Sequence, residues 1–146
     1  MMEFLLLFMR LILGGVFAYS GYSKLIAPVQ NFVAAIEAYQ FLNPPFIYPI
    51  ASILPWLELT FGVFLFLGFL TRLSASLLNV FSITFVTLLT RSIILKLPIS
   101  ECGCFGSGIS LAPHQALLLD IGLFFLAVCL SIFSSRLLSL DKRLSQ

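Results

Sequence analysis

The chain of 146 residues is 60% hydrophobic and only 10% charged, with a mean hydropathy of +1.11. An ordinary soluble domain has an apolar share nearer half, so this composition excludes one and indicates a protein that folds largely in lipid. The net charge of +2 comes from scattered Lys and Arg rather than from a basic stripe, which excludes nucleic acid as an expected partner.

Four segments are long and apolar enough to cross the hydrocarbon core, for which a helix needs about 20 residues. The first follows Met1-Met2-Glu3 without the basic region or the small-residue cleavage site of a secretory signal, so we interpret it as a retained span. We therefore predict an all-α, single integral membrane domain over 1–146, a four-transmembrane-helix bundle. The predicted spans cover about 4–24, 50–70, 73–95 and 111–133.

The connection between the first two spans, Ala27 to Tyr48, has a pattern of its own. Apolar residues such as Phe32 and Tyr39 recur in it at helical spacing before the breaker Asn43-Pro44-Pro45. This pattern predicts a short amphipathic helix that lies at the membrane interface.

The two later connections differ in length. The turn around Thr71-Arg72 is so short that the second and third spans must form an antiparallel hairpin. The connection 96–113 is longer, and it holds three glycines and two of the three cysteines. This loop therefore contains thiol groups that can react.

Both termini of a four-span protein lie on one side of the membrane, and the distribution of Lys and Arg predicts which side. The basic residues on the side of the termini are Arg10, Arg72, Arg136, Lys142 and Arg143, against Lys24, Arg91 and Lys96 on the other side. This excess predicts cytoplasmic termini in a bacterial inner membrane. The loop 96–113 would then be periplasmic or extracellular, where disulfides persist.

The motif Cys102-Gly103-Cys104 in that loop is the strongest chemical signal. Two cysteines one residue apart close a small strained ring on oxidation, and the glycine supplies the backbone freedom that the ring needs. Strained disulfides are reduced more easily than relaxed ones, so the pair suits electron transfer. We predict Cys102 and Cys104 as the catalytic residues of thiol–disulfide exchange.

Other interpretations of the loop stay open. The thiols can be free, can form a static bridge, or can bind a soft metal such as Cu, Zn or Hg together with His114, ten residues after Cys104. His114 itself is either a polar interfacial residue at a helix start or a residue that activates a thiol. Cys129 follows His114 by 15 residues, about 22 Å along a helix, and is interpreted as a small core residue.

Ionisable residues also occur within or at the ends of the predicted spans. Such groups are costly in lipid and turn towards the bundle interior, where they find partners. Lys24 can pair with Glu58, and Arg91 with Asp120, at a matched depth beneath the cysteine loop. These four residues and His114 either fix the helix register or form a polar pocket that moves protons or holds a redox carrier.

Several other residues of the spans allow simpler predictions. Tyr19, Tyr22 and Trp56 either line that pocket or anchor the helices at the interface. Arg10 is expected to extend its side chain to the cytoplasmic headgroups. The small residues Gly14 and Ala18 are expected to let helices approach closely.

Three stretches of the sequence resemble motifs of a known family. They are Arg10-Leu11-Ile12-Leu13-Gly14 with Ser23-Lys24-Leu25 in the first span, Leu54-Pro55-Trp56-Leu57-Glu58-Leu59 in the second, and Cys102-Gly103-Cys104-Phe105-Gly106 in the loop. They resemble the DoxX-like membrane proteins and, among these, the methylamine utilisation protein MauE subgroup.

The resemblance implies a membrane thiol–disulfide redox protein, a possible oxidoreductase that exchanges electrons with a thioredoxin-like extracytoplasmic partner and supports disulfide maturation. It implies no certain cofactor, although a quinone is possible. A non-catalytic membrane adaptor, a soft-metal transport protein and a lipid- or quinone-binding protein are the alternatives. The chain lacks a second exposed cysteine pair, which disfavours an internal relay between two pairs unless one pair serves alone.

Overall fold

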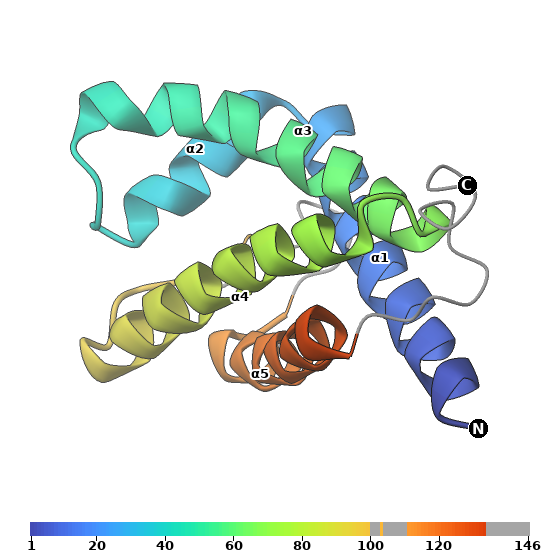
Figure 1. The fold of residues 1–146 in the computed structure, drawn as a ribbon. Coiled ribbons are helices and arrows are strands. Elements are labelled where there is room, and N and C mark those ends of the chain that lie inside the picture. The colour runs from blue at the N-terminus through green and yellow to red at the C-terminus, as the bar shows by residue number, and fades with distance from the viewer. Residues whose placement is uncertain (100–102, 104–110, 134–146) are drawn as a thin grey trace.

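The computed structural model describes residues 1–99, 103 and 111–133. These residues form five α-helices, shown in Figure 1: α1 (Met2–Ile26), α2 (Val29–Ala38), α3 (Pro44–Leu67), α4 (Thr71–Ile94) and α5 (Pro113–Ile132). Among them, α1, α3, α4 and α5 are long and apolar enough to cross a membrane. The predicted all-α class and the four candidate spans are therefore confirmed. A fifth, shorter helix, α2, lies between the first two spans in the sequence.

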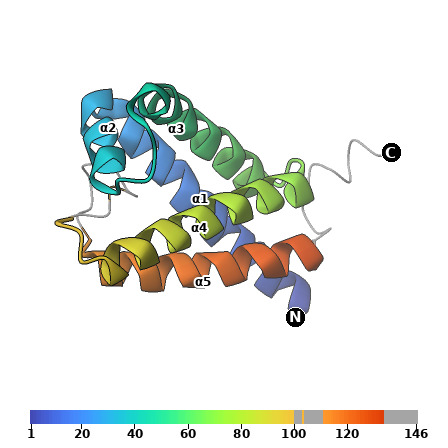
Figure 2. The ribbon, with the colours of Figure 1, turned by 90° about the vertical axis from the view of Figure 1, so that its left-hand side faces the viewer.

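Two helix pairs make up the body of the bundle. The main partner of α1 is α3, and the main partner of α4 is α5. Figure 2 shows α4 and α5 running alongside each other while α1 crosses behind them. Leu13, Leu65, Leu78 and Leu130, one from each of these four helices, are fully buried where the pairs meet.

The contact between α1 and α3 depends on glycines. A Cβ added to Gly14 would lie 2.7 Å from the backbone nitrogen of Phe66, and one added to Gly62 would lie 2.5 Å from that of Ala18. A Cβ on Gly21 would also meet the backbone of α3, at 2.6 Å. The predicted close approach at Gly14 and Ala18 is therefore confirmed, and the two backbones touch without side chains between them.

The segment Asn43-Pro44-Pro45, interpreted above as a helix breaker, forms the start of α3. Pro44 and Pro45 occupy the first helical positions, where a missing N–H costs nothing and the fixed φ of proline suits the helix. The second span thus starts six residues earlier than predicted. Glu58 lies 14 residues into α3, about 21 Å along its axis.

The hairpin between α3 and α4 is as short as predicted. Gly68 ends α3 in a left-handed conformation with φ +80°, while its N–H donates to the Leu65 carbonyl at 3.2 Å. The Phe69 N–H donates to the Phe64 carbonyl at 2.8 Å, which completes a common helix-ending motif. Only residues 68–70 then separate the two helices.

Arg10 corrects one prediction. Its side chain does not extend to the headgroups, because the residue is only 2% exposed. Its guanidinium lies against Gly68, where an added Cβ would stand 2.7 Å from Nη1. The carbonyl end of a helix carries partial negative charge, so the end of α3 offers a cation a favourable place inside the bundle.

Candidate functional site

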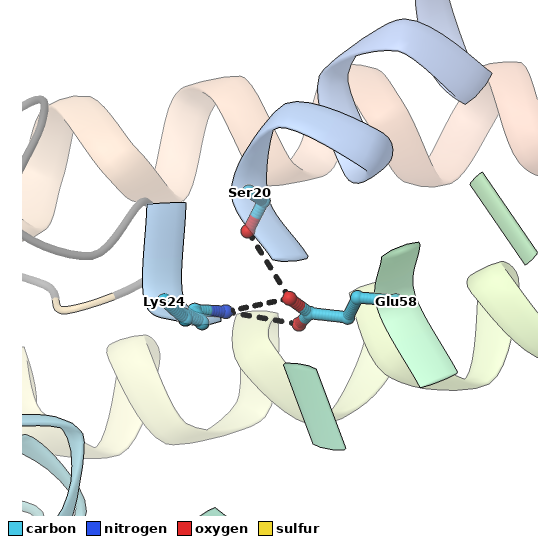
Figure 3. A network of polar contacts seen from close by, with 3 residues as sticks. All are labelled: Ser20, Lys24 and Glu58. Carbon is cyan, nitrogen blue, oxygen red and sulfur yellow. Dashed lines mark hydrogen bonds and ion pairs between the residues drawn. The ribbon is translucent and has the colours of Figure 1, made fainter. Parts of the chain in front are cut away.

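A buried ion pair joins the two helices of the first pair. Lys24 Nζ donates to Glu58 Oε2 at 2.8 Å and to Oε1 at 3.0 Å, and neither side chain has exposed surface. The Ser20 hydroxyl donates to Oε2 at 3.2 Å, as Figure 3 shows. The predicted pairing of Lys24 with Glu58 is confirmed, and it fixes the register of α1 against α3.

Aromatic rings surround the remaining side of the ammonium. Lys24 Nζ lies 4.9 Å from the ring centroid of Phe32 on α2 and 5.1 Å from that of Phe85 on α4. The negative faces of aromatic rings attract a cation within about 6 Å. Lys24 therefore connects four helices, α1 to α4, at a single point.

Ser20, Phe32 and Phe85 also belong to this site and were not predicted. A signal existed for Ser20, because residues four apart lie on the same face of a helix and Ser20 precedes Lys24 by four. No comparable signal existed for the two phenylalanines, since the chain contains 16 of them.

Arg91, which we expected beside Asp120, instead reaches α2. Its Nη1 donates to the carbonyl of Gln40 at 3.2 Å and to that of Tyr39 at 3.4 Å, at the end of that helix. Its guanidinium carbon lies 6.0 Å from the centroid of the Phe41 ring. The carbonyl end of α2 attracts a cation for the same reason as the end of α3.

The candidate residues of α5 lie in different environments. Asp120 is 4% exposed and lies one turn after Ala116, which clusters with Tyr39 and Leu89. His114 is exposed in the first turn of α5, as a residue at a helix start. Cys129 is half buried near the other end of α5 and is not one of the buried core residues, in contrast to its interpretation as a small core residue.

The aromatic residues offered as pocket or anchor residues face outward. Tyr19, Tyr22 and Trp56 are all exposed on α1 and α3. This exposure favours the second interpretation, in which they anchor the helices in the membrane.

Gly103, the central residue of the cysteine motif, packs against helix α2. Gly103 has a φ of +68°, in the left-handed region that favours glycine. A Cβ added to it would lie 2.7 Å from the Cβ of Ala35. Cys102 and Cys104, the predicted catalytic residues and alternative metal ligands with His114, lie outside the described residues. Among the residues described, no three His, Cys, Asp or Glu side chains gather as metal ligands.

A cavity of about 290 Å³ lies between α2, α3 and α4. Its lining is almost entirely apolar: Phe32, Ala35, Ile36, Tyr39, Phe41, Leu42, Ile50, Leu54, Val80, Phe81, Thr84, Phe85 and Leu88. The five residues of the predicted polar pocket are not among them. The cavity nevertheless adjoins both the ion pair and the cysteine motif, because Phe32 and Phe85 line it and lie beside Lys24, and because its lining residue Ala35 contacts Gly103.

Replacing Gly103 with alanine is expected to destabilise the protein by about 1–3 kcal/mol, because a left-handed conformation costs other residues this much. The new Cβ would also press on Ala35. Unfolding in micelles measures the effect, and the double variant Ala35→Gly/Gly103→Ala should be less destabilised than the sum of its two single variants. Strict additivity would show that the two residues do not touch.

No curated protein and no solved structure matches the chain. The family model described as methylamine utilisation protein MauE matches residues 2–134, which include the helices α1 to α5 and the Cys102-Gly103-Cys104 motif. The chain therefore belongs to the family of the methylamine utilisation protein MauE.

Proposed function

We propose that this protein is a membrane thiol–disulfide redox protein in which Cys102 and Cys104 exchange electrons with a thioredoxin-like extracytoplasmic partner. The observation that carries the proposal is the placement of Gly103, the residue between the two cysteines, on α2 in a conformation that favours glycine. A tight two-cysteine ring needs such a residue at its centre. Membership of the MauE family, and the resemblance to DoxX-like proteins, support a role in disulfide maturation.

The exchange proceeds through a mixed disulfide. A thiolate of the partner attacks one sulfur of the oxidised pair, the S–S bond breaks, and the other sulfur leaves as a thiolate. The second thiol of the partner then resolves the mixed disulfide. The partner gains a disulfide and loses two electrons and two protons, which the Cys102–Cys104 pair takes up as a dithiol.

The buried ion pair supplies a rigid base for this motif. Lys24 binds Glu58 across α1 and α3, and its ammonium contacts the Phe32 ring of α2. Because Ala35 lies three residues after Phe32 on the same helix, the position of Gly103 depends on how α2 is held. We assign Lys24 and Glu58 as positioning residues.

The proposal includes an orientation. Arg10 and Lys24 are both buried, so neither meets the headgroups. Without Arg10, four basic residues remain on the side of the termini. Without Lys24, two remain on the other side, Arg91 and Lys96. This ratio favours cytoplasmic termini in a bacterial inner membrane, an extracytoplasmic loop, and an α2 at the outer interface.

A trapping experiment tests the exchange. With one cysteine of the pair changed, Cys102→Ser or Cys104→Ser, the remaining thiol can attack the disulfide of an oxidised thioredoxin-fold protein. The mixed disulfide that forms can be resolved only by the second thiol of that protein, so it should be more abundant than in the unchanged protein. Affinity purification under acid quenching, followed by mass spectrometry, identifies the adduct, and Cys129→Ser is the matched control. An equal yield from the double variant Cys102→Ser/Cys104→Ser would contradict exchange and indicate an adaptor that holds its partner without thiol chemistry.

A further inference from the structure

In the described part of the chain, no carboxylate pairs with the guanidinium of Arg91, so its positive charge is not neutralised there. The ion pair of that part joins Lys24 to Glu58. Arg91 instead donates through Nη1 to the carbonyls of Tyr39 and Gln40, which are neutral groups. A guanidinium carries N–H groups on each of its nitrogens in a planar fork, so those of Nε and Nη2 lie outside these two bonds and can serve another acceptor.

Arg91 lies where a membrane presents its phosphate groups. It belongs to the last turn of α4, a helix of 24 residues that is apolar enough to span a membrane. Such a helix is about 36 Å long, which exceeds the hydrocarbon core of about 30 Å, so its last turn reaches the headgroups. Lys96, exposed just after the end of α4, adds a second positive charge at this level. The anion nearest to Arg91 is therefore the phosphate of a lipid.

Two apolar hollows begin beside Arg91. The first is the cavity of about 290 Å³ between α2, α3 and α4, whose lining residue Phe41 has its ring centroid 6.0 Å from the Arg91 guanidinium carbon. In Figure 1, the end of α4 lies on the same side of the bundle as α2. The second hollow is a groove of about 500 Å³ along α4, lined by Val86, Thr87, Thr90, Arg91, Ile94 and Leu95.

The cavity suits an acyl chain in size, access and chemistry. A dry apolar cavity of about 150 Å³ holds benzene, so 290 Å³ has room for about twelve carbon atoms, the greater part of an acyl chain. Phe41, Ile50 and Val80 line the cavity and are also exposed on the surface of the bundle, so a chain can enter from the bilayer. An acyl chain requires apolar walls and no hydrogen-bond donor, which is what this lining offers.

We propose that Arg91 binds the phosphate of an anionic phospholipid, one acyl chain of which occupies the cavity while the other follows the groove along α4. The planar guanidinium matches two phosphate oxygens with two parallel N–H groups. A headgroup with net negative charge is preferred, because a zwitterionic lipid brings an ammonium that the charges of Arg91 and Lys96 repel. The lipid connects α4 to the end of α2, the helix against which Gly103 packs, but its binding does not depend on thiol chemistry.

Two pairs of variants test the two ends of the lipid separately. Arg91→Gln removes a charge at the end of α4, and Arg72→Gln removes the same charge at its start, where Arg72 is exposed. Thr84→Trp places an indole in the cavity opening and leaves Arg91 unchanged, because Thr84 lines the cavity and is exposed. Thr60→Trp places the same indole on α3, where Thr60 is exposed and lines neither hollow.

Native mass spectrometry of the protein in micelles with equimolar phosphatidylglycerol and phosphatidylethanolamine counts the lipids that each chain retains. We expect one retained phosphatidylglycerol per chain, in clear excess over phosphatidylethanolamine. Arg91→Gln and Thr84→Trp should each lower this retention by about tenfold, whereas Arg72→Gln and Thr60→Trp should not change it. Equal retention of the two lipids, or an equal loss in both members of a pair, would overturn the inference.

Thermal unfolding in the same micelles shows that each variant is folded and gives a second measure of binding. Added phosphatidylglycerol should raise the Tm of the unchanged protein and of both control variants, but not that of Arg91→Gln or Thr84→Trp. If Arg91→Gln fails to fold, the comparison of Thr84→Trp with Thr60→Trp decides. Inorganic phosphate at the same concentration should not raise the Tm, because it has no chain to bury. Equal stabilisation by inorganic phosphate would show an anion site and overturn the assignment of a lipid.

Discussion

Replacing Glu58 with alanine is expected to lower the free energy of unfolding by about 3–5 kcal/mol. The variant leaves the Lys24 ammonium charged and buried between four helices, without the carboxylate that accepts its two hydrogen bonds. Reversible unfolding in mixed micelles, by titration with a denaturing detergent, measures the loss.

A double variant distinguishes the ion pair from simple packing. Lys24→Met/Glu58→Met replaces both charges with apolar side chains, which is often neutral or stabilising where a pair is buried. It should therefore be more stable than Glu58→Ala. Ser20→Ala removes one hydrogen bond of 3.2 Å to Glu58 and should cost only about 1 kcal/mol. If Lys24→Met/Glu58→Met loses as much stability as the sum of the losses of Lys24→Met and Glu58→Met, the two residues are not paired.

Replacing Gly62 with leucine is expected to separate α1 from α3 and to cost about 3 kcal/mol or more. Even the first carbon of the new side chain would lie 2.5 Å from the backbone nitrogen of Ala18, and backbone atoms cannot move aside as a flexible side chain can. Because the Lys24–Glu58 pair crosses the same interface, its geometry should be lost as well. Thermal unfolding in micelles and the yield of folded protein measure the effect.

Gly122 is the control for this substitution. An added Cβ there meets nothing within 4 Å, although Gly122 also lies inside a predicted span. Gly122→Ala should leave stability unchanged or raise it by up to about 1 kcal/mol, since alanine is the better helix former. If Gly62→Leu proves as stable as Gly122→Ala, α1 and α3 do not cross at these glycines.

Hydrophobicity made the long helices predictable, but not all of their ends. A run of about 20 apolar residues is a direct consequence of bilayer thickness, so all four candidate spans were found. The start of α3 was missed because Pro44 and Pro45 were interpreted as a breaker. Proline ends a helix before it but is equally suited to the first positions of the next, and sequence alone does not decide between these roles.

The ion pair was predictable because burying a charge is costly. That cost demands a partner, and Glu58 was available to Lys24 at a similar depth. The same rule failed for Arg91, because the carbonyl end of α2 at Gln40 also attracts a cation. Every residue carries a backbone carbonyl, so the sequence does not show which carbonyls a cation will contact.

The cavity could not be predicted at all. Its lining comes from three consecutive helices, α2, α3 and α4, and from the connection between α2 and α3, so it depends on how these elements pack and not on a sequence motif. The residues that form it are ordinary apolar ones, which occur throughout this chain. The sequence indicated a polar pocket, whereas this cavity has apolar walls and Lys24 lies behind two of its rings.

The redox state of the cysteine pair tests the central claim most directly. Membranes that contain the protein are treated with a mild reductant, quenched in acid, and labelled with a maleimide reagent whose mass reports each thiol, using a Cys129→Ser background. Reversible exchange predicts that two labels per chain appear on Cys102 and Cys104 after mild reduction and disappear after reoxidation. A pair that stays oxidised in mild reductant, or that is reduced and never reoxidised, would contradict it.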